Sequence, residues 1–142
     1  MKIVWLEDEP ETIDVVRRKL EIIYRDIIIC KSFASFSDEL DELEDKSDEV
    51  LILDIRMIFN TDIEVTCKGS EAFTIIKELE GGFEYYQKCL KARFNNLRIL
   101  FFSSKPQKEA QEEAHENDVP IEWIISKDNT MQLLEKIKEI KC

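Results

Sequence analysis

The chain has 142 residues, of which 44% are hydrophobic and 36% are charged, and its formal net charge is −11 at pH 7. This composition is typical of one soluble globular domain and excludes an intrinsically disordered chain. Because phosphates would repel so acidic a protein, the charge disfavours direct binding to nucleic acid or to an anionic membrane surface.

No apolar run approaches the ~20 residues that a membrane-spanning helix needs, and the apolar start of the chain ends at Glu7. This start is too short for a signal peptide, so we expect a cytoplasmic protein. The single histidine, His115, lies in a polar stretch typical of a surface helix. The cysteines are far apart in the sequence: Cys30, Cys67, Cys89 and Cys142. Their spacing argues against a zinc site and favours free thiols in a reducing compartment.

The first half of the chain alternates short apolar runs, typical of strands, with segments of helical periodicity. The pattern predicts, in chain order, a strand at Lys2–Leu6, a helix at Glu11–Arg25, a strand at Ile27–Cys30, a helix at Ser37–Leu43 and a strand at Val50–Leu53. Ser37 is expected to cap the second helix. The last of these strands is apolar on both faces, as expected at the centre of a parallel sheet.

The same alternation continues in the second half of the chain. The pattern predicts a helix at Gly69–Leu79, a break at Gly81 and Gly82, further helix at Phe83–Phe94, a strand at Leu97–Phe102, a helix at Pro106–Glu116, a strand at Ile121–Ile125 and a helix at Asn129–Ile140. Five strands alternating with helices indicate an α/β fold with a doubly wound parallel sheet and right-handed crossovers. We expect one domain over residues 1–142.

Polar side chains follow four of the predicted strands where each strand ends. They are Glu7 and Asp8, Asp54, Ser103, and Lys127. Because the carboxyl ends of parallel strands gather at one edge of a sheet, we expect these groups to meet in one crevice. Carboxylates, a hydroxyl and an amine are the groups needed to move a phosphoryl group onto a carboxylate with Mg²⁺.

Asp54 follows the most apolar strand, where a carboxylate is poorly solvated unless it is paired. It is either a nucleophile that accepts phosphate or an ordinary turn aspartate. Three neighbouring carboxylates would repel one another unless a cation lay between them, and Mg²⁺ prefers such oxygen ligands. We expect Asp8 and Asp54 as direct ligands, Glu7 as a direct or water-mediated ligand, and the Arg56 backbone carbonyl as a further one. Alternatively, the acidic residues after the first strand only stabilise the start of a helix.

Lys127 and Ser103 complete the predicted site. The Lys127 ammonium group can neutralise phosphoryl oxygens, and the Ser103 hydroxyl can donate a hydrogen bond to them. A lysine after a strand is otherwise a solvated side chain, and a serine there is an ordinary loop residue.

The chain resembles, over nearly its whole length, the receiver domain of two-component response regulators, the CheY-like superfamily. Glu7-Asp8-Glu9-Pro10 is similar to the acidic pair of that family, and Asp54-Ile55-Arg56-Met57 is similar to its phosphoacceptor motif. Ser103 and Lys127 fall on its switch hydroxyl and its lysine. The resemblance implies a stand-alone, flavodoxin-like three-layer sandwich with strand order 2-1-3-4-5. It also implies that Asp54 takes phosphate from a histidine kinase or phosphotransfer protein, that the domain catalyses phosphorylation and dephosphorylation of itself, and that it signals to a downstream protein by a surface switch.

Several positions depart from the pattern of that family. Glu7 replaces the more usual aspartate, and Asp128 replaces the common proline after the lysine. The loop over residues 58–68 is longer than typical, and residues 80–96 resemble an extension of the third helix. Arg56 and Lys105 lie two residues after Asp54 and Ser103, positions that resemble those flanking water access in that family. The resemblance implies that their cationic side chains shield an acyl phosphate from water.

Two other functions remain open from the sequence. The first is a pseudo-receiver, a phosphorylation-independent protein-interaction module, which Glu7 and the long loop favour. The second is a small-ligand or flavin-binding domain of similar topology. The second is disfavoured because no glycine-rich phosphate-binding loop follows the first strand and the crevice is acidic.

Overall fold

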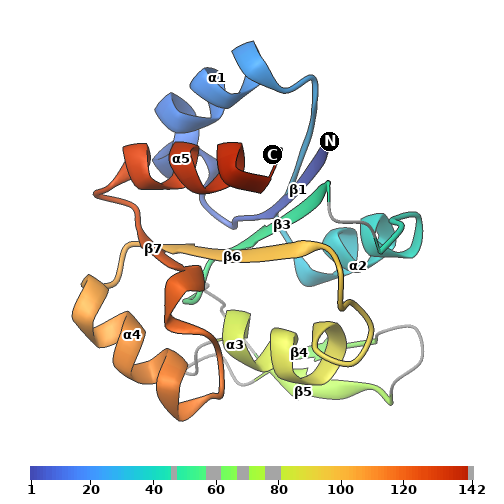
Figure 1. Cartoon of the computed structure of the whole chain (residues 1–142). Coiled ribbons are helices and arrows are strands. Elements are labelled where there is room, and N and C mark those ends of the chain that lie inside the picture. Colours follow the sequence, from blue (N-terminus) through green and yellow to red (C-terminus); the bar gives the residue numbers. More distant parts are fainter. Residues whose placement is uncertain (46–47, 57–61, 67–70, 76–80, 141–142) are drawn as a thin grey trace.

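Five parallel strands form the central sheet of the protein (Figure 1). The computed structural model describes residues 1–45, 48–56, 62–66, 71–75 and 81–140. Within them the strands are β1 (Lys2–Leu6), β2 (Asp26–Cys30), β3 (Glu49–Leu53), β6 (Arg98–Ser103) and β7 (Ile124–Ser126). Their order is β2-β1-β3-β6-β7, and every neighbouring pair is parallel. The predicted doubly wound, flavodoxin-like sheet and its strand order are confirmed.

Helices cover both faces of this sheet and form the outer layers (Figure 1). On one face lie α1 (Asp14–Ile23) and α5 (Thr130–Ile140), and on the other lie α2 (Phe33–Asp41), α3 (Gly81–Tyr85) and α4 (Gln107–Glu116). Shorter helical turns are η1 (Pro10–Ile13), the π-helical η2 (Tyr86–Leu90) and η3 (Ile121–Trp123). Among the described residues, no helix has the length and apolar character that crossing a bilayer requires.

Neighbouring residues of the sheet fill separate cores on its two faces, because side chains alternate along a strand. Phe102 packs edge-on against Trp5 in the core beneath α1 and α5, with ring centroids 5.9 Å apart. Phe101 packs against Phe83 and Tyr86 in the core beneath α2, α3 and α4. The aromatic residues of β1 and β6 are therefore core residues.

Helix α2 begins earlier than the sequence pattern predicts. Ser32 caps it, with its backbone extended and its Oγ accepting a hydrogen bond from the Ser35 N–H at 3.2 Å. The early start buries Phe33. Ser37, the predicted cap, lies inside the helix, and its Oγ is hydrogen-bonded to the Tyr85 hydroxyl at 2.6 Å.

The predicted helix at Gly69–Leu79 is wrong where the structure describes it. Strand β5 (Phe73–Ile75) pairs antiparallel with β4 (Ile63–Val65), forming a separate two-stranded sheet. Its burial has a period of two, since Phe73 is half-buried, Thr74 exposed and Ile75 buried. The apolar spacing of these residues fits either a helix or a strand, and the pairing with β4 selects the strand.

Three other predicted segments differ in part from the structure. Part of the predicted long loop, 58–68, is strand β4, while positions 58–61 and 67–68 lie outside the described residues. In the predicted extended helical region, 80–96, Gly81 and Gly82 begin α3, and the helical structure continues as η2 to Leu90. The predicted strand at Ile121–Ile125 starts only at Ile124, because η3 occupies the residues after Pro120.

Asp45 joins the connection after α2 to the segment that leads into β6. Its Oδ1 accepts hydrogen bonds from the N–H groups of Asn96 at 2.8 Å and Leu97 at 3.0 Å, and its Oδ2 accepts one from the Asn95 N–H at 3.1 Å. Burial raises the pKa of Asp45, but these hydrogen bonds outweigh it and lower the pKa overall. The carboxylate thus holds the entry of β6 in place.

We expect Asp45→Ala to lower the free energy of unfolding by about 1 to 2 kcal/mol at pH 7, as loss of a helix cap does. A carboxyl group whose folded-state pKa is lowered stabilises the protein above its unfolded pKa, and this contribution is lost as the pH falls through the folded-state pKa. Urea unfolding at pH 7 and pH 3 should therefore show a smaller difference between wild type and variant at pH 3. An equal difference at both pH values would contradict the electrostatic part of this account.

Candidate functional site

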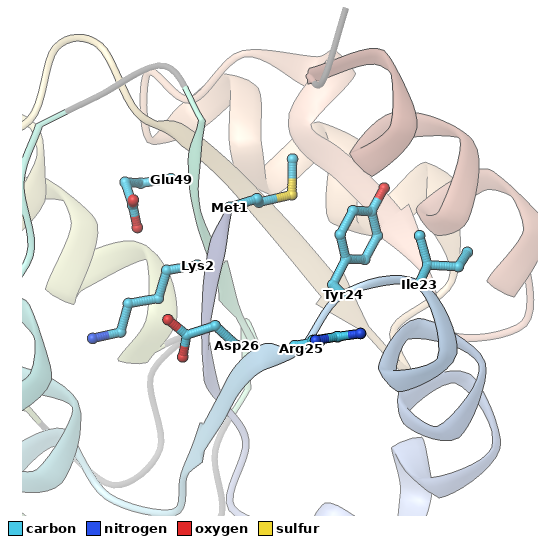
Figure 2. A pocket seen from close by; sticks show the side chains of 7 residues that line it. All are labelled: Met1, Lys2, Ile23, Tyr24, Arg25, Asp26 and Glu49. Atoms are coloured by element: carbon cyan, nitrogen blue, oxygen red, sulfur yellow. The ribbon is translucent and has the colours of Figure 1, made fainter.

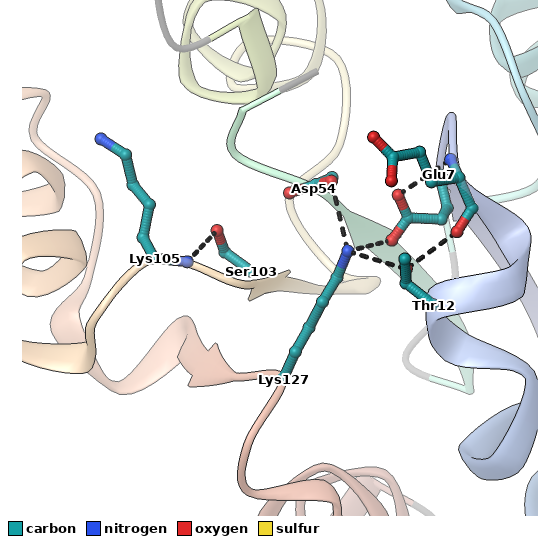
Figure 3. Close-up of polar contacts among 7 residues, drawn as sticks. Glu7, Thr12, Asp54, Ser103, Lys105 and Lys127 are labelled. Atoms are coloured by element: carbon teal, nitrogen blue, oxygen red, sulfur yellow. Dashed lines mark hydrogen bonds and ion pairs between the residues drawn. The ribbon is translucent and has the colours of Figure 1, made fainter. Parts of the chain in front are cut away.

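Four strand ends meet at one edge of the sheet and carry the predicted polar residues (Figure 3). Glu7 follows β1, Asp54 follows β3, Ser103 ends β6 and Lys127 follows β7. Backbone hydrogen bonds fix three of these positions beyond the strands. The Glu7 N–H donates to the last carbonyl of β2 at 2.9 Å, the Asp54 N–H to the last carbonyl of β1 at 3.1 Å, and the Lys127 N–H to the Ser103 carbonyl at 2.8 Å.

Lys127 joins the two carboxylates that lie deepest in the site. Its Nζ is 2.5 Å from Glu7 Oε1 and 3.4 Å from Asp54 Oδ2, and it donates to Thr12 Oγ1 at 3.3 Å. Glu7 is fully buried, and 12% of the Lys127 side chain is exposed. Burial lowers the pKa of Lys127, but Asp54 and Glu7 outweigh it and raise the pKa overall, so the group is a cation at neutral pH.

The two carboxylates carry more negative charge than one ammonium group can balance. Burial, and then the charge of Asp54, raise the pKa of Glu7 to about 8, against the opposing effect of Lys127. Burial is also the main cause that raises the pKa of Asp54, again opposed by Lys127. The site therefore favours a further proton or a further cation.

Asp8 adds a third carboxylate to the pair. One oxygen atom from each of Glu7, Asp8 and Asp54 lies within 4.8 Å of the others. Asp54 Oδ1 is buried and accepts no hydrogen bond from any described residue. An all-oxygen donor set with an unpaired buried oxygen fits a hard divalent cation such as Mg²⁺. Arg56 lies next in this loop with its side chain exposed, and the role of its backbone carbonyl stays a prediction.

Gly82 is a site residue that the sequence analysis missed. Its N–H donates to the Ile55 carbonyl at 3.0 Å, and an added Cβ would lie 2.0 Å from the Asp54 carbonyl oxygen. The start of α3 thus lies directly against the backbone of Asp54. The Gly81-Gly82 pair signalled only a break in a helix, although glycine also marks close backbone approach.

Ser103 lies at the site, but the Lys105 side chain points away from it (Figure 3). Ser103 is 1% exposed, and its Oγ accepts a hydrogen bond from the Lys105 N–H at 3.2 Å. The Lys105 ammonium group instead forms an ion pair with Glu113 on α4, and Glu109 Oε1 lies 3.9 Å from it. The expectation that Lys105 shields an acyl phosphate on Asp54 stays a prediction. A buried ammonium group needs an anion, and Glu113 supplies it.

The cysteines agree only in part with the prediction of free thiols. Cys30 is free and buried, and burial raises the pKa of its thiol to about 11, so it is unreactive. Cys89 is disulfide-bonded, which corrects the prediction for this residue. Cys67 and Cys142 lie outside the described residues.

A hollow of about 410 Å³ opens at the opposite edge of the sheet, where β1, β2 and β3 begin (Figure 2). It is lined by Met1, Lys2, Ile23, Tyr24, Arg25, Asp26 and Glu49. Glu7, Asp8 and Asp54 are not among these residues. The hollow therefore plays no part in the site at the carboxyl ends of the strands.

No family model matches the sequence, and no curated protein matches it. Solved structures do match its fold. A response regulator receiver protein from Dyadobacter fermentans superposes with a TM-score of 0.65 at 19% identity, covering 99% of this chain and 97% of that chain. RcsB from Salmonella enterica serovar Typhimurium, solved bound to a promoter in the presence of the phosphomimetic BeF₃⁻, gives 0.60 at 18% identity, with 99% and 97% covered. A response regulator from Colwellia psychrerythraea gives 0.59 at 13% identity, with 98% and 94% covered. The chain thus has the fold of response-regulator receiver domains.

Proposed function

We propose that this chain is a phosphoryl-accepting receiver in a two-component phosphorelay. Asp54 accepts the phosphoryl group from a histidine kinase or phosphotransfer protein, and the phosphorylated surface acts on a downstream protein. The observation that carries the proposal is the buried arrangement of Lys127 between Glu7 and Asp54, with Asp8 beside them, at the carboxyl edge of this fold.

The chemistry follows from the positions of the groups. An Asp54 carboxylate oxygen forms a bond to phosphorus while the bond from phosphorus to the donor atom breaks, and the donor keeps the electron pair. Lys127 neutralises charge on the phosphoryl oxygens, and the Ser103 hydroxyl, which accepts from Lys105 N–H, still has its own hydrogen to donate.

Glu7, Asp8 and Asp54 would hold Mg²⁺, with the Arg56 carbonyl as a further ligand. Bound there, the ion supplies positive charge that stabilises the transferring phosphoryl group. The protein contributes three carboxylates already gathered by the backbone, of which Glu7 and Asp54 are buried. Because they are fixed before the ion arrives, little reorganisation accompanies binding.

Intact-mass spectrometry after incubation with acetyl phosphate, with and without Mg²⁺, tests this function. We expect one phosphoryl adduct that requires Mg²⁺ and is absent in Asp54→Asn. Asp48→Asn, an exposed aspartate near the start of β3, is the matched control and should keep the adduct. An adduct of equal yield in Asp54→Asn would show that another residue is modified.

One observation favours a pseudo-receiver as the second candidate. Lys127 lies 2.5 Å from Glu7 and 3.4 Å from Asp54, so an ammonium group of the protein already pairs with two of the three carboxylates without a metal. In that case the wild type would show neither Mg²⁺ binding nor an adduct, and Asp54→Ala would leave partner binding unaltered.

A further inference from the structure

Lys105 is a buried cation next to the phosphorylation site that the proposed chemistry does not use. Only 5% of its side chain is exposed, and its ammonium group contacts both carboxylate oxygens of Glu113. Its backbone N–H donates to Ser103 Oγ at 3.2 Å, so the same residue contacts the site and α4. Buried lysines are uncommon, and one that joins two functional elements needs an explanation.

The charges of the site change when Asp54 is phosphorylated. Three carboxylates, the Lys127 ammonium group and one Mg²⁺ together carry no net charge. An acyl phosphate replaces the single charge of Asp54 by about two negative charges. One negative charge is then uncompensated in a largely buried site, where it attracts a nearby cation more strongly than it would in water.

Besides Lys127, two described cations closely follow the strands that end at Ser103 and before Asp54: Lys105 after β6 and Arg56 after β3. Arg56 is exposed, so water and salt screen its charge. Lys105 is buried, and its present partner Glu113 is itself partly exposed, with 23% of its side chain accessible. Glu113 can therefore return to water at smaller cost than Lys105 can remain unpaired.

Resting on the proposed function, we propose that Lys105 exchanges partners when Asp54 is phosphorylated. Its ammonium group leaves Glu113 for the phosphoryl oxygens, and α4 loses the ion pair that holds it to the β6–α4 connection. Glu113 thus competes with the phosphoryl group for one cation. Phosphorylation is coupled to α4 through this competition, and the coupling acts equally in both directions.

The test is a titration of BeF₃⁻ with Mg²⁺ into the full chain, followed by calorimetry. We expect Glu113→Gln to bind BeF₃⁻ about tenfold more tightly than the wild type, because the competitor for Lys105 is gone. Lys105→Met should bind about tenfold more weakly. In the Lys105→Met background, Glu113→Gln should have no further effect.

Two matched controls accompany the titration. Glu109→Gln alters the more distant and more exposed carboxylate, 3.9 Å from Lys105, and Arg56→Ala removes the exposed cation. Both should stay within about twofold of the wild type. Amide hydrogen exchange gives a second measurement that does not depend on affinity, since BeF₃⁻ should speed exchange in α4 of the wild type but not of Lys105→Met.

The outcomes separate this inference from the function on which it rests. If the wild type binds BeF₃⁻ only with Mg²⁺ but Lys105→Met and Glu113→Gln bind it equally well, the exchange of partners is refuted and the receiver function stands. If the wild type does not bind BeF₃⁻ at all, both are refuted.

Discussion

Replacing Lys127 with methionine should lower the free energy of unfolding by about 3 kcal/mol at pH 8 in metal-free buffer. The variant removes the cation that lies 2.5 Å from Glu7 and 3.4 Å from Asp54, and it leaves two buried carboxylates without a partner. Removing one member of a buried ion pair costs more than the pair itself contributes, because the remaining charge stays desolvated.

The loss should depend on pH with a definite sign. The pKa of Glu7 is raised from 4.5 to about 8, so protons bind the folded state more tightly than the unfolded state. Such a group stabilises the protein below its unfolded pKa, and this contribution is lost as the pH rises toward the folded-state value. Without Lys127, which lowers the pKa values of both carboxyl groups, the loss at high pH grows. The free energy of unfolding of the variant should therefore be close to that of the wild type at pH 5 and furthest below it at pH 8.

Urea unfolding in EDTA at pH 5 and pH 8, repeated with Mg²⁺, measures the loss of stability and its dependence on pH. Mg²⁺ should stabilise Lys127→Met more than the wild type, since the carboxylates then gain a cation. Adding Glu7→Gln to the variant should restore part of the stability, and Lys108→Met, an exposed lysine of α4, should change little. A loss that is equal at both pH values and insensitive to Mg²⁺ would mean that Lys127 acts only by packing.

Replacing Gly82 with alanine should cost about 3 kcal/mol of stability and also impair the site. The added Cβ would lie 2.0 Å from the Asp54 carbonyl oxygen and 3.0 Å from the Ile55 Cα. Both are backbone atoms, so neither can rotate away, and either α3 or the Asp54 loop must shift. Because Asp54 carries the predicted nucleophile, a shift of its backbone misplaces the carboxylate.

Urea unfolding and acetyl phosphate labelling of the same preparation separate the two effects. We expect a lower unfolding midpoint and a lower yield of Mg²⁺-dependent adduct in protein that is still folded. Lys88→Ala, in the turn after α3, is the control, since it removes only a surface ion pair with Glu84 and a contact over the Phe73 ring. That variant should lose less than about 1 kcal/mol and label normally. Normal labelling in folded Gly82→Ala would show that the contact is structural alone.

The sequence was sufficient to predict the sheet and the residues at its edge. Strands of a parallel sheet are apolar on both faces, and a polar residue at the end of such a run is conspicuous, as at Asp54 and Lys127. The strand order was also predictable, because the resemblance to receivers depends on motifs that lie on these strands. What the sequence predicted well was thus local, or was tied to strand ends.

Each feature that was missed depends on a contact whose partner is distant in the sequence or is not identified by any sequence pattern. The strand at Phe73–Ile75 needs Ile63–Val65 as its partner, and neither segment identifies the other. Lys105 pairs with a glutamate eight residues away in a helix whose only apolar residues are Ala110 and Ala114, so no pattern singles out Glu113. Gly82 shows its role only when the Asp54 backbone is placed beside it. Each depends on tertiary geometry that residue spacing does not contain.

The β4–β5 hairpin has a consequence for engineering this chain. Val65 and Ile75, at 3% and 0% exposed, belong to the same buried cluster as Phe83 and Tyr85 of α3. Excising the hairpin to obtain a minimal domain would remove these side chains and leave a hole beneath α3, which lies against Asp54 through Gly82. Trimming or grafting at this position would thus alter the site itself, so chimeras are better joined elsewhere, and the hairpin should be transplanted together with α3.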